Sequence, residues 1–288
     1  LPGSPQLFRP AQAIPLTRDH ADSGIAARSL GLDACALFMR SLPFLFSLLC
    51  SFALPALGED FTPTLGPAIP EITVQCDEIT LLLRRSSQWT PGRFDFRGHA
   101  MTTEKSAYGT VFLLPEIGFI GTNHLENEPE DLQSLTFFLD KKAIENPPPL
   151  LSGSTFRLER KSRIRAFALT SIVELRENRI YETATIQAEQ EVPLKLVYHF
   201  MHAWKPTVSA FLSGHEEGPE DAPSGELHDG EDTARTFFLN RAVDWVAVYE
   251  PESGQFAVSR LLAVPDGVKH SSKIWNVPGT YRKFYLTS

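Results

Sequence analysis

Cysteine is scarce in this chain, which has only Cys35, Cys50 and Cys76 among its 288 residues. The first two precede the domain that we expect to fold, so that domain keeps only Cys76 and cannot form an internal disulfide. A domain of this kind depends on its hydrophobic core for stability. Cys76 follows Ile72 and Val74 in alternation, and this pattern predicts a small buried hydrophobic residue rather than a reactive thiol.

Positive charge is also in short supply. The chain has 27 Lys and Arg residues against 35 Asp and Glu residues, which gives a formal net charge of −8 at pH 7. Such a protein repels phosphate at long range, and this argues against nucleic acid and anionic membranes as partners. Neutral ligands or cations are the better expectation.

No apolar run is long enough to cross a bilayer, which takes roughly 20 residues. The longest run, Leu42–Leu54, comes after Arg40 and is followed by Pro55 and small residues up to Gly58. A charged segment, an apolar segment and a small-residue cleavage site are typical of a secretory signal peptide. We therefore expect residues 39–58 to be a signal peptide and the protein to be secreted or periplasmic, with no integral membrane segment after cleavage.

The flanking segments carry further expectations. Residues 1–38 have several prolines and no clear period, so we interpret them as an upstream, non-native extension; the alternative is a pro-region ahead of an internal membrane anchor. Residues 59–70 are Pro-rich and typical of a linker. The strand pattern at Arg282–Ser288 stops abruptly, so we expect the reading frame to be incomplete at its C-terminus.

A helical period is missing as well: no stretch after residue 70 keeps one for three turns. Short runs rich in β-branched and aromatic residues alternate instead with Gly, Pro, Asn and Asp, and this pattern predicts strands. We expect a single all-β domain over residues 71–288, built as a large antiparallel β-sandwich. The main expected strands are Ile79–Leu83, Tyr108–Leu114, Ile117–Thr122, Ser134–Leu139, Phe156–Glu174 with a break near Ser162, Arg179–Ala188, Leu194–Trp204, Thr236–Leu239, Val243–Tyr249, Gln255–Ala263 and Tyr281–Leu286.

Two charged segments stand out. The loop 214–232 is rich in carboxylates, but its spacing matches no calcium-binding loop, and we expect a solvated insertion rather than a metal site. The segment 157–165 alternates basic residues along a strand and predicts a solvated face. No G-x-S-x-G motif is present, which argues against an α/β-type serine hydrolase.

The segment 197–204, VYHFMHAW, is the densest group of functional side chains. His199 and His202 are three residues apart, so on a regular strand they point in opposite directions and cannot share a metal ion. Alternation places Met201 and Ala203 with His199 on one face. It places Tyr198, Phe200, His202 and Trp204 on the other. This second face is equally typical of a sugar-binding surface and of an aromatic core strand.

Short motifs in the chain resemble those of the galactose-mutarotase-like superfamily. His124 in GTNHLEN is similar to the first histidine of that family, and His202-Ala203-Trp204 in FMHAW is similar to the second. Arg93 in RFDF is similar to the sugar-binding arginine that precedes the first histidine. The family's late glutamate has no clear counterpart before Ser288. The resemblance implies a β supersandwich that binds a carbohydrate.

The sequence thus gives two hypotheses. In the first, the protein is a secreted carbohydrate-binding or carbohydrate-active protein, and any enzyme activity is that of an acid–base epimerase or lyase. His124 and His202 are then the catalytic candidates, and the candidates for sugar binding are Arg93, His99, Tyr198 and Trp204. Neither a metal nor another cofactor is expected. In the second hypothesis, the protein is a non-catalytic structural or interaction domain of the cell envelope.

Overall fold

The computed structural model describes residues 65–106, 109–122, 130–216, 222–233, 236–264 and 267–288. All of them belong to one compact unit, Gly58–Ser288. The expected upstream extension and signal peptide, and most of the linker, lie outside the described residues. Among the residues that are described, no helix is long and apolar enough to cross a membrane.

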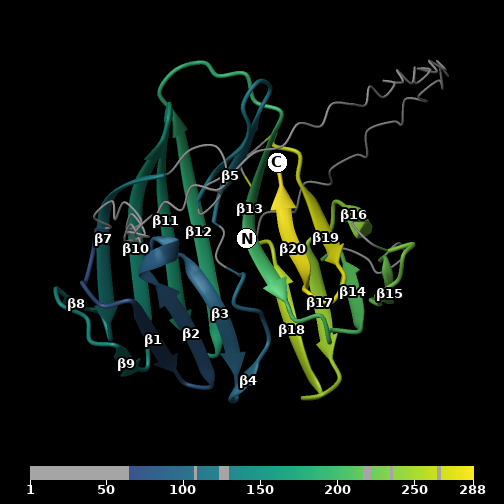
Figure 1. Ribbon diagram of the computed structural model, residues 1–288, viewed down its shortest axis with the longest axis horizontal. Coiled ribbons are helices and arrows are strands. Elements are labelled where there is room, and N and C mark those ends of the chain that lie inside the picture. The colour runs from purple at the N-terminus through teal and green to yellow at the C-terminus, as the bar shows by residue number, and fades with distance from the viewer. Residues whose placement is uncertain (1–64, 107–108, 123–129, 217–221, 234–235, 265–266) are drawn as a thin grey trace, which may run out of the picture. The chain divides into compact units, whose positions relative to one another are not determined.

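The described chain is built from strands, apart from one 3-10 turn, η1 (Arg85–Ser87) (Figure 1). The prediction of an all-β chain is therefore confirmed. In chain order the strands are β1 (Glu71–Cys76), β2 (Ile79–Arg84), β3 (Pro91–Phe96), β4 (His99–Ala100), β5 (Val111–Leu114), β6 (Gly118–Gly121), β7 (Asp131–Leu139), β8 (Lys142–Ile144), β9 (Leu150–Gly153), β10 (Phe156–Ile164), β11 (Phe167–Arg176), β12 (Arg179–Ala188), β13 (Leu196–Trp204), β14 (Ala210–Gly214), β15 (Ser224–Glu226), β16 (Phe237–Arg241), β17 (Trp245–Glu250), β18 (Gln255–Arg260), β19 (Ser271–Val277) and β20 (Tyr281–Thr287).

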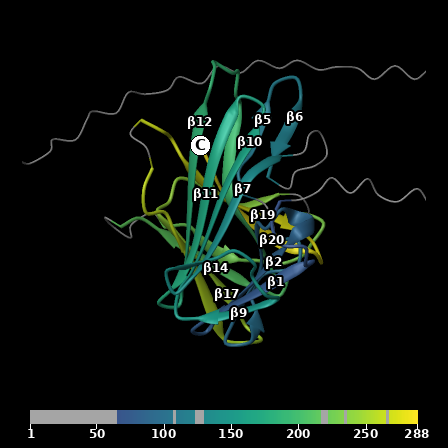
Figure 2. The same cartoon turned by 90° about the vertical axis from the view of Figure 1, so that its left-hand side faces the viewer.

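These strands form four sheets. Sheet I has the order β4-β3-β2-β1-β9, and sheet II the order β12-β11-β10-β7-β8. Sheet III has the order β16-β19-β20-β13-β5-β6, and sheet IV the order β15-β14-β17-β18. Figure 2 shows the long strands of sheet II side by side. Among the described strands the pairing is antiparallel, as expected, except between β1 and β9, which run parallel.

Alternating side chains supply the hydrophobic core. Ile72 and Leu81 of sheet I pack in one cluster with Phe137, Leu158 and Leu175 of sheet II. Burial of such side chains is the main stabilising contribution, at roughly 1.5–3 kcal/mol each. Cys76 is 2% exposed and belongs to this cluster, so its prediction as a small buried residue is confirmed. Burial raises the pKa of its thiol to about 11, which keeps the thiol protonated.

Two more clusters link the remaining sheets. Ile274 and Phe284 of sheet III pack with Phe211 and Val246 of sheet IV. A third cluster joins sheet III to sheet II: its members are Phe112, Leu114, Ile120, Ile164, Phe167, Leu169 and Val197. The Phe112 and Phe167 rings are stacked, with their centroids 4.0 Å apart. Sheet II therefore contributes to the cores of both neighbouring sheets.

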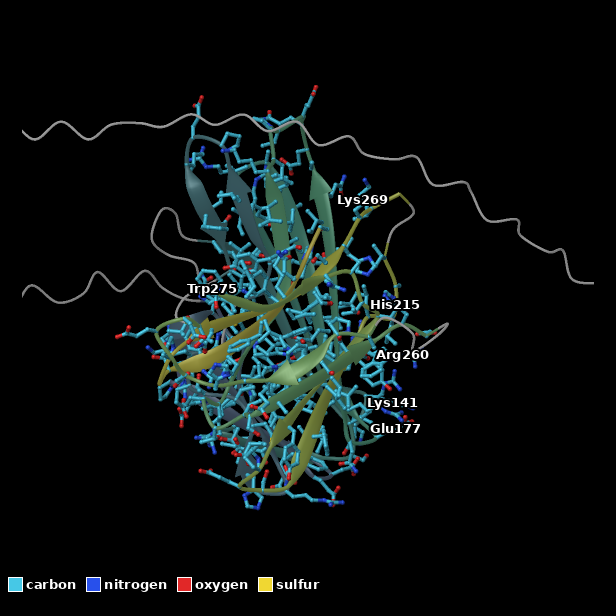
Figure 3. The ribbon with its side chains drawn as sticks, turned by 90° about the vertical axis from the view of Figure 1, so that its right-hand side faces the viewer. Lys141, Glu177, His215, Arg260, Lys269 and Trp275 are labelled. Atoms are coloured by element: carbon cyan, nitrogen blue, oxygen red, sulfur yellow. The ribbon has the colours of Figure 1, made fainter. Side chains whose placement is uncertain are left out.

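Tight turns connect the long strands of sheet II. The β7–β8 hairpin turns at Asp140 and Lys141, and the β11–β12 hairpin at Glu177 and Asn178, all with positive φ. Two consecutive positive φ values are typical of the turn that matches the right-handed strand twist. In the sequence, the turn residues at 175–179 predict a hairpin between two of the expected strands, and the structure confirms it. Lys141 and Glu177 mark these turns in Figure 3.

Boundaries and charged segments differ from expectation in three places. The expected break in strand 156–174 falls between Ile164 and Phe167, while only a register shift occurs at Ser162. The prediction of a solvated face at 157–165 holds for Arg157, Lys161 and Arg163 but not for Arg160, which is 2% exposed. The acidic insertion is solvated over most of its described part, as expected, but it is not a free loop, since β15 pairs with β14 and Leu227 is 4% exposed.

Candidate functional site

The strand β13 does not keep a regular alternation. Its register against β20 shifts between His199 and His202, and Phe200 has a φ of 52°, in the left-handed region. A bulge of this kind inserts one residue and turns the following side chains to the other face. Tyr198 consequently packs with Met201 and Ala203 in one cluster. Its predicted place on the face of His202 and Trp204 is therefore wrong.

The same bulge removes the alternation that placed His199 with Met201 and Ala203, so the two histidines lie on one face of the strand, but they have different partners. His199 Nδ1 lies 3.4 Å from Thr110 Oγ1, and His199 Nε2 lies 3.2 Å from Ser288 Oγ. His202 contacts a different group of residues altogether. Among the described residues, no group of three His, Cys, Asp or Glu side chains is placed to hold a metal ion.

His202 is paired with a carboxylate from another sheet. Its Nε2 lies 2.6 Å from Oε2 of Glu182, and the two side chains are 12% and 16% exposed. Glu182 belongs to β12, the edge strand of sheet II, and β12 lies next to β13 of sheet III (Figure 1). Because a carboxylate only accepts hydrogen bonds, Nε2 is the donor in this pair. We call Glu182 and His202 the dyad.

Aromatic rings enclose the imidazole. The ring of Phe94 is edge-on at 5.1 Å between centroids, and that of Trp204 is edge-on at 5.6 Å. Phe284 adds a third ring at 6.1 Å. These walls hold the imidazole in one orientation and reduce its contact with water, which strengthens its interaction with the carboxylate. His202 Nδ1 is buried and has no hydrogen-bond partner among the described residues.

This geometry suits proton transfer. With Nε2 donating to Glu182, the neutral imidazole has its lone pair on the buried Nδ1, and a ligand has to reach this atom for a proton transfer to occur. The nearby carboxylate then stabilises the imidazolium that forms. A histidine oriented by a carboxylate is a recurring arrangement in acid–base catalysis.

A small, mostly apolar hollow lies beside Glu182 of the dyad. Its lining includes Glu182, Arg160 and Ser171 of sheet II, Phe200 of sheet III, and Thr110, which immediately precedes β5. The hollow has a volume of about 20 Å³, enough for one or two water molecules. Arg160 is held in its wall by Glu130, with Nη2 3.2 Å from Oε2, and by the carbonyl of Gln88, which accepts from Nε at 2.9 Å.

Arg93 does not face the dyad. Neighbouring residues of a strand point to opposite faces. Phe94 contacts His202, so Arg93 points the other way, where it binds the carboxylates of Asp95 and Glu104. The Arg93 guanidinium is therefore already paired with two carboxylates.

The other predicted residues occupy varied surroundings. His99 is exposed on the short edge strand β4. Trp204 is 5% exposed and contacts His202, while Tyr198 is 3% exposed. His124 lies outside the described residues. The structure thus brings His202 and Trp204 together and leaves Arg93 and His99 apart from them.

Glu182 was missed in the sequence, although a signal for it exists. In the strand RIYETATIQA, the residues of one face are Ile180, Glu182, Ala184 and Ile186. A glutamate among inward apolar positions is unusual, because an ionised carboxylate is costly to bury without a partner. The sequence alone cannot show that the partner is His202, which comes 20 residues later on a different sheet.

No family model, curated protein or solved structure matches the chain. The dyad and its surroundings are therefore the basis for a functional proposal.

Proposed function

We propose that this protein binds or transforms a carbohydrate, with His202 as the acid–base group and Glu182 as the carboxylate that orients it. The observation that carries the proposal is the 2.6 Å contact between Nε2 and Oε2, enclosed by three aromatic rings. If the protein is an enzyme, the reaction is an epimerisation or an elimination on a sugar, since both need a proton moved to and from a positioned base.

The fold assignment and the location belong to the same proposal. We assign the four sheets to a supersandwich of the galactose-mutarotase type. This assignment is supported by the shared cores of sheets I and II and of sheets III and IV, and by the cluster that joins II to III. The short motifs around His124 and His202 support it as well. The signal-like pattern at residues 39–58 supports export to the periplasm or the medium.

Kinetics on two dyad variants test the proposal. The full chain is assayed for mutarotation of aldoses by polarimetry and for unsaturated sugar products by ultraviolet absorbance. His202→Asn and Glu182→Gln should each lower the rate by about 10²–10⁴-fold, because each removes one half of the proton-transfer pair. Circular dichroism should show that both variants fold.

The exposed pair of His215 and Asp244 supplies the control. His215 Nδ1 lies 3.4 Å from Asp244 Oδ2, with side chains 43% and 34% exposed, and His215 is labelled in Figure 3. His215→Asn removes a similar pair far more open to water, and it should leave the rate unchanged. Dyad variants that fold and keep full activity would show that the assignment is wrong.

A second candidate function is a non-catalytic interaction or structural domain of the cell envelope. The small size of the hollow, about 20 Å³, favours it, because a sugar ring does not fit there without side-chain movement. The near-complete burial of Trp204 favours it too, since this ring has little surface left for stacking. A folded protein that binds no sugar on a glycan array and shows no turnover in either assay would support this candidate.

A further inference from the structure

Sheet III has an unusual charge composition. None of the residues in its six strands is Asp or Glu, although the chain has 35 of them. The same strands contain Arg241, Lys273, Arg282 and Lys283. The charged residues of these strands are therefore all basic, which the net charge of the chain does not reveal, although Arg282 is paired with Asp229 from outside the sheet.

The face of sheet III that points away from the sheet IV core carries two lysines among aromatic rings. The inward residues Ile274 and Phe284 lie in the core shared with sheet IV. Alternation therefore places Lys273 and Trp275 of β19 on the opposite face, together with Lys283 of β20. We call this face, with Phe237, Tyr281 and Tyr285, the aromatic–lysine face; Trp275 is labelled in Figure 3.

The rings and ammonium groups of this face are in contact. Phe237 and Trp275 are edge-on, with centroids 4.8 Å apart, and Lys273 Nζ lies 5.5 Å from the Phe237 centroid. Lys283 Nζ lies 5.4 Å from the centroid of Tyr285. Register joins the two groups, because Lys273 is opposite Tyr285 and Trp275 is opposite Lys283. The face is therefore continuous across β16, β19 and β20.

The aromatic–lysine face is partly exposed to solvent. Phe237 is 41% exposed, and Lys273, Trp275, Tyr281, Lys283 and Tyr285 are all half-buried. Burial raises the pKa of Tyr285 to about 12 and lowers the pKa of Lys273. A partly desolvated ammonium group interacts more strongly with an anion than one in bulk water does.

We propose that the aromatic–lysine face binds a short acidic sugar, with Trp275 and Phe237 against the apolar face of a ring and Lys273 and Lys283 near its carboxylate or sulfate. Tyrosine hydroxyls offer hydrogen bonds to the sugar hydroxyls. Two ammonium groups match a ligand with one or two negative charges. A nucleic acid fits less well, because it needs a longer basic track and is repelled by the net charge of −8.

This site is separate from the dyad. His202 contacts Phe284, on the inward side of sheet III, whereas the aromatic–lysine face is on the other side. The proposal therefore goes beyond the proposed function. Variants of one site should leave ligand binding at the other unchanged.

Calorimetry with defined acidic sugars tests the proposal on the full chain. The probes are trigalacturonic acid, a hyaluronan disaccharide and a sulfated chondroitin disaccharide, with maltotriose as the neutral comparison. Wild type should bind at least one acidic probe more tightly than maltotriose, and added salt should weaken that binding. Lys273→Met and Phe237→Ala should each raise the Kd on the order of tenfold, the effect of losing about 1.4 kcal/mol of interaction.

Two control variants carry the same kinds of substitution on other sheets and test whether the loss of binding is specific to the aromatic–lysine face. Phe256→Ala removes a ring that is 58% exposed on β18 of sheet IV, and Lys161→Met removes an exposed lysine on β10 of sheet II. Both should bind like wild type. The proposal would be overturned if wild type bound none of the three acidic probes. It would also be overturned if Phe237→Ala and Lys273→Met bound them as tightly as wild type does. Tighter binding of oligothymidine than of every sugar would point to a nucleic acid instead.

Discussion

The half-buried His199 makes the stability of the folded protein depend on pH. Burial lowers its pKa from the usual 6.5 to about 4, while Thr110 and Ser288 lie within hydrogen-bond reach of its ring. Between these two pH values the unfolded chain takes up the proton and the folded chain does not. The contribution of His199 to stability is therefore full above pH 6.5 and decreases as the pH falls toward 4.

A substitution isolates this effect. His199→Gln keeps a polar group near Thr110 but cannot gain a proton. From pH 7 to pH 5, wild type should lose on the order of 1 kcal/mol more unfolding free energy than the variant does. Urea melts at the two pH values measure the difference. Identical pH dependence in both proteins would mean that His199 is as easily protonated in the folded state as in the unfolded chain.

At the scale of a single element, β10 shows what strand periodicity gives and what it leaves out. Its apolar residues Phe156, Leu158 and Ile164 fall on the inward positions, as alternation predicts. Arg160 falls on the same inward face, because position and not chemistry sets the direction of a side chain in a strand. The arginine is tolerated there because Glu130 and the Gln88 carbonyl meet its guanidinium.

Removing one partner of the Arg160–Glu130 pair should lower the free energy of unfolding strongly, whereas replacing both partners with apolar residues should lower it little. The two side chains are 2% and 0% exposed, so Arg160→Met leaves a buried carboxylate without its partner. The expected loss of unfolding free energy is about 3–5 kcal/mol. The double variant Arg160→Met/Glu130→Leu should recover most of that loss, since apolar residues can replace a buried ion pair. Denaturant melts of the three proteins decide the matter, and a loss below about 1 kcal/mol in the single variant would contradict the prediction.

At the scale of the whole molecule, a polar network joins the described part of the acidic loop to sheet III. Arg282, with a side chain 2% exposed, binds Asp229, Asn276 and the carbonyl of Pro206. Asn276 donates to the Thr233 carbonyl at 3.1 Å, and Gly279 N–H donates to Asp229 at 2.7 Å. The segment therefore packs on the sheet through charge-assisted hydrogen bonds as well as through apolar contacts.

Asp229→Asn tests this attachment. Partial burial raises the pKa of Asp229, but hydrogen bonds from Arg282 and the Gly279 N–H outweigh it, and the pKa is lowered from 3.8. The stabilisation is thus present above pH 3.8 and is lost as the pH falls through the lower folded-state value. At pH 7 the variant should be less stable by about 1 kcal/mol. The difference should shrink at pH 3; an equal difference at both pH values would contradict an ionised Asp229 as its source.

The sequence by itself determined the strand content, the burial of Cys76 and the hairpin at residues 175–179, because these depend on alternation and on turn chemistry within a few residues. It also singled out His202 as a candidate. Only the tertiary structure decided that Glu182 is its partner and that Tyr198 lies on the other face, since a bulge at Phe200 and the contact of two sheets are not local properties. The carboxylate-free sheet III was hidden for the same reason: its six strands, residues 111–114, 118–121, 196–204, 237–241, 271–277 and 281–287, are separated in the chain and become neighbours only through hydrogen bonding.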